Sequence, residues 1–387
     1  MAKTVTTGRP PGEVLAWSRE LTGPPLRSAV ESLPPSMRRI AAYHFGWLDE
    51  QGRPASGNAG KAVRPALVLL AAEAAGGSAA SAVPAAVAVE LVHNFSLLHD
   101  DVMDGDATRR HRPTAWSVFG VSGAILAGDA LLTLAFEVLR AGGGPVADEA
   151  TRVLGAAVLD LVEGQSADTS FETRDEVTLA ECVSMAEGKT AALLAASCAL
   201  GALSGDGGPE VIEALRAFGS RLGLAFQMVD DLLGIWGDPS VTGKPVFSDL
   251  RNRKKSLPVV AALTSATPPG KQLTAFYRHP HPPTSPARPS TPAGSEHAAA
   301  APGISPAGQP PASSASSVLA PAEQAPGTPE LARMASLIEA AGGRAWTQAR
   351  ADDLLAEALA HLASADPAPR PAAELHALAH LLAKRDH

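Results

Sequence analysis

Two acidic segments, each at the end of an apolar helical stretch, are the parts of this sequence best suited to chemistry. The first is Asp100-Asp101-Val102-Met103-Asp104, in which residues four apart project from nearly the same side of a helix. We therefore expect three carboxylates to converge. Clustered carboxylates without His or Cys suit Mg²⁺, which binds through one or two of them together with phosphate oxygens. An acidic, solvated helix end would show the same residues, so this motif alone decides nothing.

The second segment, Asp230-Asp231, follows Phe226-Gln227-Met228-Val229 and repeats the pattern of an apolar run that ends in paired aspartates. Two facing carboxylate clusters could hold several Mg²⁺ ions around one diphosphate and stabilise its departure as an anion. Arginine forms bidentate contacts with phosphate and lysine supplies a mobile charge, although any one such residue taken alone is more often a solvated surface cation. The basic residues that could serve are Lys61, Arg64, Arg109, Arg110, Lys189 (followed by Thr190), Lys244, Lys254 and Lys255.

The elements that must position these residues are predicted to be helices. Aromatic residues make up only 4% of the 387 residues, whereas Ala, Leu and Val dominate, a balance that favours helix over sheet. Apolar residues recur at three- and four-residue spacing from about Glu13 to Leu263 and again from Leu331 to Leu381. The sequence therefore predicts an all-α fold, a succession of helices joined by short loops.

Composition divides the chain into four parts. Residues 1–12 lack periodicity and are expected to form a flexible tail, and residues 13–277 the helical core. Residues 278–328 are almost entirely Pro, Ala, Ser, Gly and Thr, which bury too little apolar surface to order, so we expect a disordered insert. Residues 329–387 are helical again, as a separate module or as the completion of one interrupted fold.

Charge and cysteine content exclude several classes of protein. The net charge of −8 argues against a general nucleic-acid binder, whose affinity rests on neutralising phosphates. Cys182 and Cys198 have no metal-ligand spacing, which predicts neither a disulfide framework nor a zinc site. The N-terminus lacks the apolar region of a secretory signal, and the apolar stretch 190–203 is too short to span a bilayer. We expect a cytoplasmic protein without a transmembrane segment.

The sequence resembles the trans-isoprenyl diphosphate synthase (polyprenyl synthetase) family. The order and spacing match from about residue 37 to residue 263, and the chain after Thr328 resembles the last helices of the family, which favours one fold with an insert. The matching segments are Gly60-Lys61-Ala62-Val63-Arg64-Pro65, His93, Ser96 to Asp101, Asp104 with Arg109-Arg110, Arg112-Pro113-Thr114, Gly128-Asp129, Gly164-Gln165, Gly188-Lys189-Thr190, Phe226-Gln227 with Asp230-Asp231, Gly243-Lys244-Pro245, Asp249, Lys254 and Ser256-Leu257-Pro258.

The resemblance implies the isoprenoid synthase helical bundle around a central active-site cavity, Mg²⁺ as cofactor, a homodimer, and condensation of an allylic diphosphate with isopentenyl diphosphate. By position, Asp100, Asp104 and Asp230 resemble the Mg²⁺ ligands, with Asp101 in support. The residues that would hold the allylic diphosphate are Arg109, Lys189 with Thr190, Gln227, Lys244 and Lys254; those that would hold isopentenyl diphosphate are Lys61, Arg64, His93 and Arg110. Lys189 also counts among the expected catalytic residues.

The sequence departs from the family pattern at several positions. Gly234 stands where the second motif usually ends in a carboxylate, and Asp238 is too far along the helix to replace it. Ala59 and Ala62 thin the first basic motif, and His111 replaces a common Gly. These changes leave open a catalytically reduced homologue that acts as a partner subunit.

Phe95, five residues before Asp100, bears on product length. An aromatic residue there resembles the geranylgeranyl (C20) type within a C15–C20 range, whereas Phe95 could equally be an ordinary core residue. A class I terpene cyclase shares the fold and first motif, but would not need a second diphosphate site at Lys61, Arg64 and Arg110. The Pro/Ala-rich insert also resembles segments of bacterial polyprenyl synthases carried as cargo in encapsulin shells, which suggests a targeting role.

Overall fold

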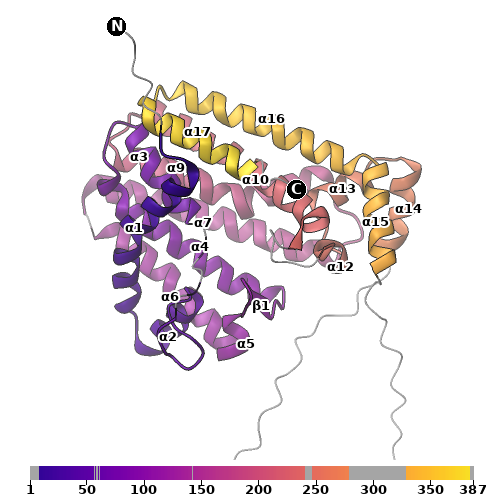
Figure 1. Ribbon diagram of the computed structural model, residues 1–387, viewed down its shortest axis with the longest axis horizontal. Helices are drawn as coiled ribbons and strands as arrows, with labels where there is room; N and C mark the ends of the chain where they lie inside the picture. The colour runs from indigo at the N-terminus through magenta and orange to yellow at the C-terminus, as the bar shows by residue number, and fades with distance from the viewer. Residues whose placement is uncertain are drawn as a thin grey trace, which may run out of the picture.

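The computed structural model describes residues 8–55, 57, 60, 62–141, 143–239, 246–278 and 328–383, and this part of the chain is almost entirely helical (Figure 1). A short antiparallel hairpin, β1 (Thr108–Arg109) and β2 (Arg112–Pro113), follows the fourth helix. The helices are α1 (Pro11–Glu31), α2 (Pro35–His44), α3 (Val63–Ala74), the 3₁₀ turn η1 (Ala79–Ala82), α4 (Val83–Met103), α5 (Ala115–Phe119), α6 (Val121–Arg140), α7 (Gly144–Thr173), α8 (Leu179–Ala186), the π-helical turn η2 (Glu187–Ala191), α9 (Ala192–Ser204), α10 (Pro209–Trp236), α12 (Ser248–Arg251), α13 (Leu257–Leu263), α14 (Pro268–Tyr277), α15 (Thr328–Ala340), α16 (Gly343–Ser364) and α17 (Pro369–Ala383).

Local sequence signals explain where several helices begin. Pro209 and Pro268 stand at the first position of α10 and α14, where a missing N–H removes no helical hydrogen bond. The start of α8 is a capping box, in which Thr178 accepts from the backbone N–H of Glu181 and the Glu181 side chain accepts from that of Thr178. These starts are therefore set by residues within one helical turn.

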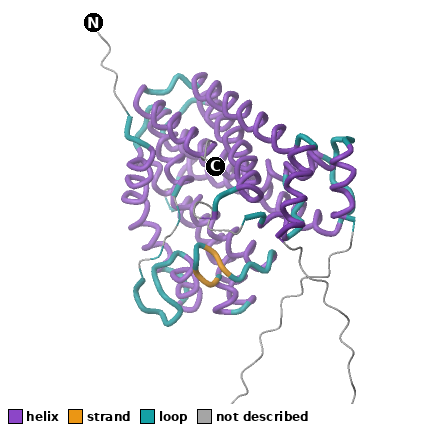
Figure 2. Tube along the Cα trace, turned by 45° about the vertical axis from the view of Figure 1, so that its right-hand side comes forward, coloured by secondary structure: helices purple, strands orange, loops and turns teal. Residues whose placement is uncertain are grey.

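The two helices that carry the acidic segments are each embedded in a large hydrophobic cluster. α4 packs against α3 and α6, and its cluster includes the fully buried Leu91, Leu98 and Leu131. α10 packs against α9 and α16, and its cluster includes the fully buried Phe218 and Leu222. The tube drawing shows the helices gathered into one bundle, with the short hairpin, in orange, in the lower part of the view (Figure 2). Packing on several sides thus fixes both helices along their length.

The helices after residue 328 pack on the same bundle as the helices before the expected insert. α16 lies along α10 and also contacts α13, and α17 contacts α3, as Figure 1 shows for the yellow C-terminal helices. α14 and α15, on either side of the insert, pack against each other. Residues 279–327 of the expected insert 278–328 lie outside the described residues, whereas Thr328 belongs to α15.

The expectation of a flexible tail through residue 12 is wrong for residues 8–12. α1 already begins at Pro11, and Arg9 is bound to α17. The backbone N–H and Nε of Arg9 both donate to Oε1 of Glu374 at 2.9 Å, and Nη2 donates to Oε2 at 2.6 Å. The Arg9 guanidinium also lies 3.8 Å from the centre of the Trp17 ring. A long-range ion pair, which local composition does not reveal, orders this segment.

Within the described residues, two stretches other than 190–203 are long and apolar enough to cross a membrane by length and composition alone. In Ala79–Met103, 67% of the most apolar window is buried inside the bundle, as in the core helix of a water-soluble protein. In Val121–Arg140 the buried share is 33%. One or two such helices are weak evidence for a membrane span, because core helices pass the same test.

Candidate active site

The first acidic segment closes α4 and sends its aspartates in different directions. Asp100 is partly buried and Asp104 is exposed, and the backbone N–H of Asp104 donates to the carbonyl of Asp100 at 2.8 Å. Partial desolvation of the carboxyl groups raises the pKa of both, although Asp104 as a whole residue is exposed, and the charge of Lys189 opposes that rise in both. The two carboxylates that share Lys189 are therefore the pair suited to a common cation.

Asp101 lies apart from that pair. It is 1% exposed, and its Oδ1 accepts a hydrogen bond of 2.6 Å from Nε of Arg109. Burial raises the pKa of Asp101 to about 6, although the charge of Arg109 opposes the rise. Its role in this arrangement is to hold Arg109 beside the acidic pair, so two of the three expected carboxylates converge.

Arg109 and Arg110 come from the hairpin that follows α4. Arg110 and His111 form its turn with φ angles of 53° and 61°, as expected where two-residue hairpins need left-handed residues. Gly60 makes room for Arg110, because a Cβ at Gly60 would lie 2.7 Å from Nη2 of Arg110. The hairpin thus places Arg109 on the acidic side and Arg110 on the neighbouring cavity.

Lys189 reaches the acidic pair from the π-helical turn η2. Its Nζ lies 2.6 Å from Oδ2 of Asp168 on α7, and Nζ of Lys254 lies 3.8 Å from the same oxygen. The turn packs directly on α7 because Gly164 has no side chain: a Cβ there would lie 2.2 Å from the backbone N of Lys189. Burial opposes ionisation of Asp168, but the charges of Lys254 and Lys189 outweigh it and lower its pKa.

Asp168 is a site residue that the sequence analysis missed. It stands three residues after Gln165, about one helical turn beyond the Gly164-Gln165 segment that was singled out. That spacing was the available signal, because a residue one turn away lies on the same side of the helix.

The two carboxylates of the second acidic segment differ in their surroundings: Asp231 is held by hydrogen bonds, and Asp230 acts on Arg64. Asp231 is 4% exposed; its Oδ2 accepts from the backbone N–H of Leu257 at 2.8 Å and its Oδ1 from Nε2 of Gln227 at 2.7 Å. Gln227 in turn accepts from Oγ1 of Thr190 at 2.5 Å. Burial raises the pKa of Asp231 to about 7. These contacts connect α10 to α13 and to η2. Asp230, by contrast, is partly buried, and its negative charge acts to raise the pKa of Arg64.

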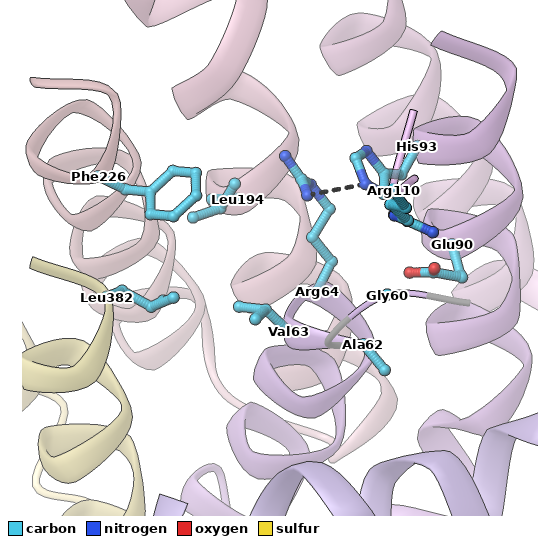
Figure 3. A pocket seen from close by; sticks show the side chains of 10 residues that line it. All are labelled: Gly60, Ala62, Val63, Arg64, Glu90, His93, Arg110, Leu194, Phe226 and Leu382. Carbon is cyan, nitrogen blue, oxygen red and sulfur yellow. Dashed lines mark hydrogen bonds between the residues drawn. The ribbon is translucent and has the colours of Figure 1, made fainter. Parts of the chain in front are cut away.

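A cavity of ≈ 160 Å³ opens beside these groups (Figure 3). Its polar wall contains Arg64, Glu90, His93 and Arg110, and Nη1 of Arg64 lies 3.4 Å from Nε2 of His93. Figure 3 shows the opposite wall, which is apolar and consists of Leu194, Phe226 and Leu382 from α9, α10 and α17, with Val63 near the base of Arg64.

The polar wall contains two arginines and one glutamate, a set of charges that suits an anion. Burial lowers the pKa of Arg64 and Arg110, and the charge of Glu90 opposes this change in both. Burial, with Arg64 and Arg110 acting in the same direction, places the pKa of His93 well below its ordinary value. His93 is therefore neutral at neutral pH, while the two arginines supply the positive charge.

Lys61 and Lys244 lie outside the described residues. Phe95 is 6% exposed within the α4 cluster, and its ring meets that of His99 edge-on with centres 4.8 Å apart. The structure thus brings together the expected residues Asp100, Asp104, Arg109, Lys189 and Lys254, with Arg64, His93 and Arg110 in the adjoining cavity.

The donor set fits Mg²⁺ only in partnership with phosphate. Among the residues that the structure describes, no three acidic, His or Cys side chains are clustered closely enough to hold a metal ion by themselves. Mg²⁺ normally uses one or two carboxylates together with substrate phosphates and water. Carboxylates of this kind are Asp100 and Asp104 at the end of α4 and Asp230 on α10. The cations that could contact the phosphates are Lys189, Arg109 and Lys254.

Comparison with known proteins agrees with this geometry. The family model for polyprenyl synthetase matches residues 46–286. The chain is 46% identical over 372 residues to a (2E,6E)-farnesyl diphosphate synthase of Mycobacterium tuberculosis, covering 96% of this chain and 92% of that protein. It is 52% identical over 268 residues to a geranylgeranyl diphosphate synthase of the same species, covering 69% of this chain and 77% of that protein.

A solved structure extends the agreement to the fold. The structure of a polyprenyl synthetase from Streptomyces coelicolor matches with a TM-score of 0.80 and 45% identity, covering 96% of this chain and 98% of that one. The protein belongs to the polyprenyl synthetase family. The expected all-α isoprenoid synthase fold is confirmed.

Proposed function

We propose that the protein is a Mg²⁺-dependent trans-prenyltransferase that joins an allylic diphosphate to isopentenyl diphosphate. The observation that carries this proposal is the presence of two adjoining anion sites. One contains Arg109 and Lys189 beside Asp100 and Asp104, and the other is the cavity lined by Arg64, His93 and Arg110. An enzyme that joins two diphosphates needs both, whereas a terpene cyclase, which takes a single diphosphate, needs only the first.

The residues of the acidic side are assigned to the allylic diphosphate. Asp100, Asp104 and Asp230 would hold Mg²⁺, which when bound supplies positive charge that stabilises the departing diphosphate. Lys189 and Lys254 are held by Asp168 at the edge of the same site. They would move from that carboxylate to phosphate oxygens, which charge-assisted hydrogen bonds favour. Lys244, outside the described residues, is assigned to this group from the sequence alone.

The residues of the cavity are assigned to isopentenyl diphosphate. Arg64 and Arg110 would hold its phosphates, and neutral His93 would add a hydrogen bond without repelling either arginine. Lys61 is assigned here from the sequence alone. The apolar wall of Leu194 and Phe226 leaves room for the hydrocarbon, and holding the alkene against the allylic centre replaces an encounter in solution.

The product is proposed to be C15–C20, and geranylgeranyl diphosphate in particular. Phe95 lies in the helix that carries the first acidic segment, five residues before Asp100, and would limit the hydrocarbon there. Phe95→Ala is expected to lengthen the product by one or more C5 units, detected by mass spectrometry. Phe136→Ala, which removes a partly buried ring from the same cluster but from α6, should leave product length unchanged. Equal product lengths for wild type and Phe95→Ala would assign Phe95 to the core alone.

A homodimer in the cytoplasm completes the proposal. Exposed apolar side chains concentrate on α6 and α7, including Leu126 at 54% and Leu159 at 71% exposure. A second copy of the chain would cover such side chains, and the molar mass in solution tests this. A targeting role for the insert, as in encapsulin-shell cargo, rests on residues 279–327, which lie outside the described residues.

The experiment that tests the reaction uses the purified full chain with Mg²⁺, isopentenyl diphosphate and each of the C5, C10 and C15 allylic diphosphates in turn. The expected result is a longer prenyl diphosphate from at least one of them, abolished by chelation of the metal. Failure to extend any of the three in the presence of Mg²⁺ would contradict the proposal and favour the alternative of a noncatalytic partner subunit.

A further inference from the structure

Gly234, where the second acidic segment lacks its last carboxylate, is in contact with a carboxylate from another helix. A Cβ atom on Gly234 would lie 2.4 Å from Oδ2, 2.5 Å from Cγ and 2.6 Å from Oδ1 of Asp249. Real Cβ atoms essentially never come within 3.0 Å of such neighbours. The carboxylate of Asp249 therefore occupies the volume that a side chain at position 234 would fill.

Hydrogen bonding and packing hold Asp249 in this position. Oγ of Ser248 donates to the carbonyl of Gly234 at 3.1 Å and lies 3.4 Å from Oδ1 of Asp249. Leu250, the next residue on α12, is fully buried in the same hydrophobic cluster as Ile235 of α10. The residues on both sides of Asp249 thus attach α12 to the helix that carries the second acidic segment.

Lys254 connects Asp249 to the rest of the site. The backbone N–H of Lys254 donates to the carbonyl of Asp249 at 2.8 Å, and its side chain reaches Asp168. Burial alone would lower the pKa of Lys254, but the charges of Asp168, Asp249 and Asp231 outweigh burial and raise it. The negative charges of Asp249 and of the acidic segments therefore all stabilise the charged form of Lys254, so these groups belong to the same site.

We propose that Asp249 supplies, from α12, the carboxylate that the second acidic segment lacks at Gly234. Asp230 and Asp249 would then serve the α10 side of the Mg²⁺–diphosphate site, facing Asp100 and Asp104 on α4. This inference rests on the proposed function, because it assigns Asp249 to the same metal and diphosphate. A carboxylate oxygen is the donor that Mg²⁺ prefers, and the absent side chain at Gly234 is what makes room for it.

A direct consequence is that adding a side chain at position 234 does not repair the site. The Asp249 carboxylate is the end of a short side chain, so a new Cβ displaces it instead of unfolding the helix. Gly234→Asp would in addition bring two like charges into one small volume, which Coulomb repulsion disfavours. We expect both Gly234→Asp and Gly234→Ala to weaken Mg²⁺-dependent binding.

The test is calorimetric binding of inorganic pyrophosphate at a series of Mg²⁺ concentrations, with Asp249→Asn, Gly234→Ala and the double variant. Each single variant is expected to raise the Mg²⁺ concentration for half-saturation by about tenfold, the usual effect of removing a group that holds or orients a metal. The double variant should be no worse than Asp249→Asn, because the alanine acts by displacing the same carboxylate. Thermal unfolding of each variant confirms that the fold is kept.

Two control variants separate this effect from general changes in charge or helix content. Gly23→Ala adds a methyl group to α1 where nothing lies within 4 Å, and Asp353→Asn removes an exposed charge from α16. Both should bind pyrophosphate as the wild type does. The inference would be overturned if Asp249→Asn bound pyrophosphate as the wild type does, or if the losses in the double variant were additive. The proposed function would still stand in that case, provided that the wild type shows Mg²⁺-dependent binding. Absence of such binding in the wild type would overturn both.

Discussion

His44, at the end of α2, is a buried base surrounded by positive charge. Its Nε2 is buried and has no hydrogen-bond partner within the described part of the chain. Burial lowers the pKa of His44 to about 3; the charges of Arg110, Arg109 and Arg112 act in the same direction, and only a hydrogen bond to Asn94 opposes them. In the unfolded chain a histidine titrates near pH 6.5. Between these values the unfolded state binds a proton that the folded state does not.

The stability contributed by neutral His44 is therefore complete above about pH 6.5 and is lost as the pH falls toward 3. His44→Gln should reduce the pH dependence of the unfolding free energy over this range. The reduction is up to ~1.4 kcal/mol per pH unit, the slope that corresponds to the binding of one proton. Denaturant unfolding at several pH values measures this slope. His376→Gln, at an exposed position on α17, is the control. An unchanged slope in His44→Gln would show that other groups carry the acid sensitivity.

Residue types and spacing predicted the site only in part. Asp100, Asp104 and Arg109 were found because they are close in sequence and their charges suit phosphate and metal. The pairing of Asp101 with Arg109 and the capping of Leu257 by Asp231 were not predicted. Adjacent aspartates differ by about 100° in direction along a helix, so each meets a different neighbour. Which neighbour it meets is decided by packing between segments that are distant in sequence.

At the scale of elements, the hairpin after α4 stores backbone strain in its turn, next to the candidate site residue Arg110. His111 has φ 61°, and a left-handed conformation costs a residue with a side chain roughly 1–2 kcal/mol. His111→Gly is therefore expected to raise the unfolding free energy by up to about 1 kcal/mol, part of the gain being lost to the greater freedom of unfolded glycine.

The reverse substitution supplies the matched control for that prediction. Gly105 also has a left-handed backbone, with φ 67°, and nothing lies within 4 Å of a Cβ placed there. Gly105→Ala should therefore lower stability by a similar amount through backbone strain alone. Chemical denaturation compares the two variants with the wild type. A lower stability for His111→Gly would show that contacts of the imidazole outweigh the strain.

Long helices were predictable and short ones were not. The apolar periodicity of α4 and α10 extends over many turns, so the sequence alone indicates both helices and the ends that carry the acidic segments. α12 has four residues, too few for a periodic pattern. It begins after Phe247, which adopts φ 63° without the glycine that usually signals such a turn. The contact between Asp249 and Gly234 depends on this helix and was therefore not predicted.

At the scale of the whole molecule, contacts between the chain ends hold the bundle together. Arg9 binds Glu374, whose side chain is fully buried, and Arg370 of α17 binds Glu73 of α3 at 2.6 Å. The ion pair of Arg9 joins residues 365 positions apart. Sequence periodicity predicted that helices resume after the insert, but it left open whether they form a separate module. The packing of α16 on α10 is a property of the folded chain only.

We predict that residues 279–327 can be replaced by a short Gly/Ser linker without loss of folding. α14 and α15 already pack against each other, so a short linker can join them. Each halving of loop length lowers the cost of loop closure by only about 0.6 kcal/mol, so the thermal midpoint should be equal or slightly higher. Mg²⁺-dependent condensation should be retained.

A chain that ends at residue 278 is the contrasting variant. It lacks α16 and α17, whose Leu354 and Leu378 are fully buried in the cluster around α10. Losing this cover should prevent stable folding, because the apolar side of α10 would meet water. Unfolding of the linker variant would contradict the prediction that the insert is dispensable, and a stable truncated chain would make the C-terminal helices a separate module.

The measurement that tests the central proposal most directly is the rate of condensation by Asp100→Ala and Asp104→Ala. Both carboxylates lie at the end of α4, where the charge of Lys189 acts on both, and the proposed function assigns them to Mg²⁺. We predict that either variant loses about 100-fold or more in kcat at saturating Mg²⁺, the usual effect of removing one group that stabilises transition-state charge. Thermal unfolding should show an intact fold. Full activity in either purified variant would contradict the account.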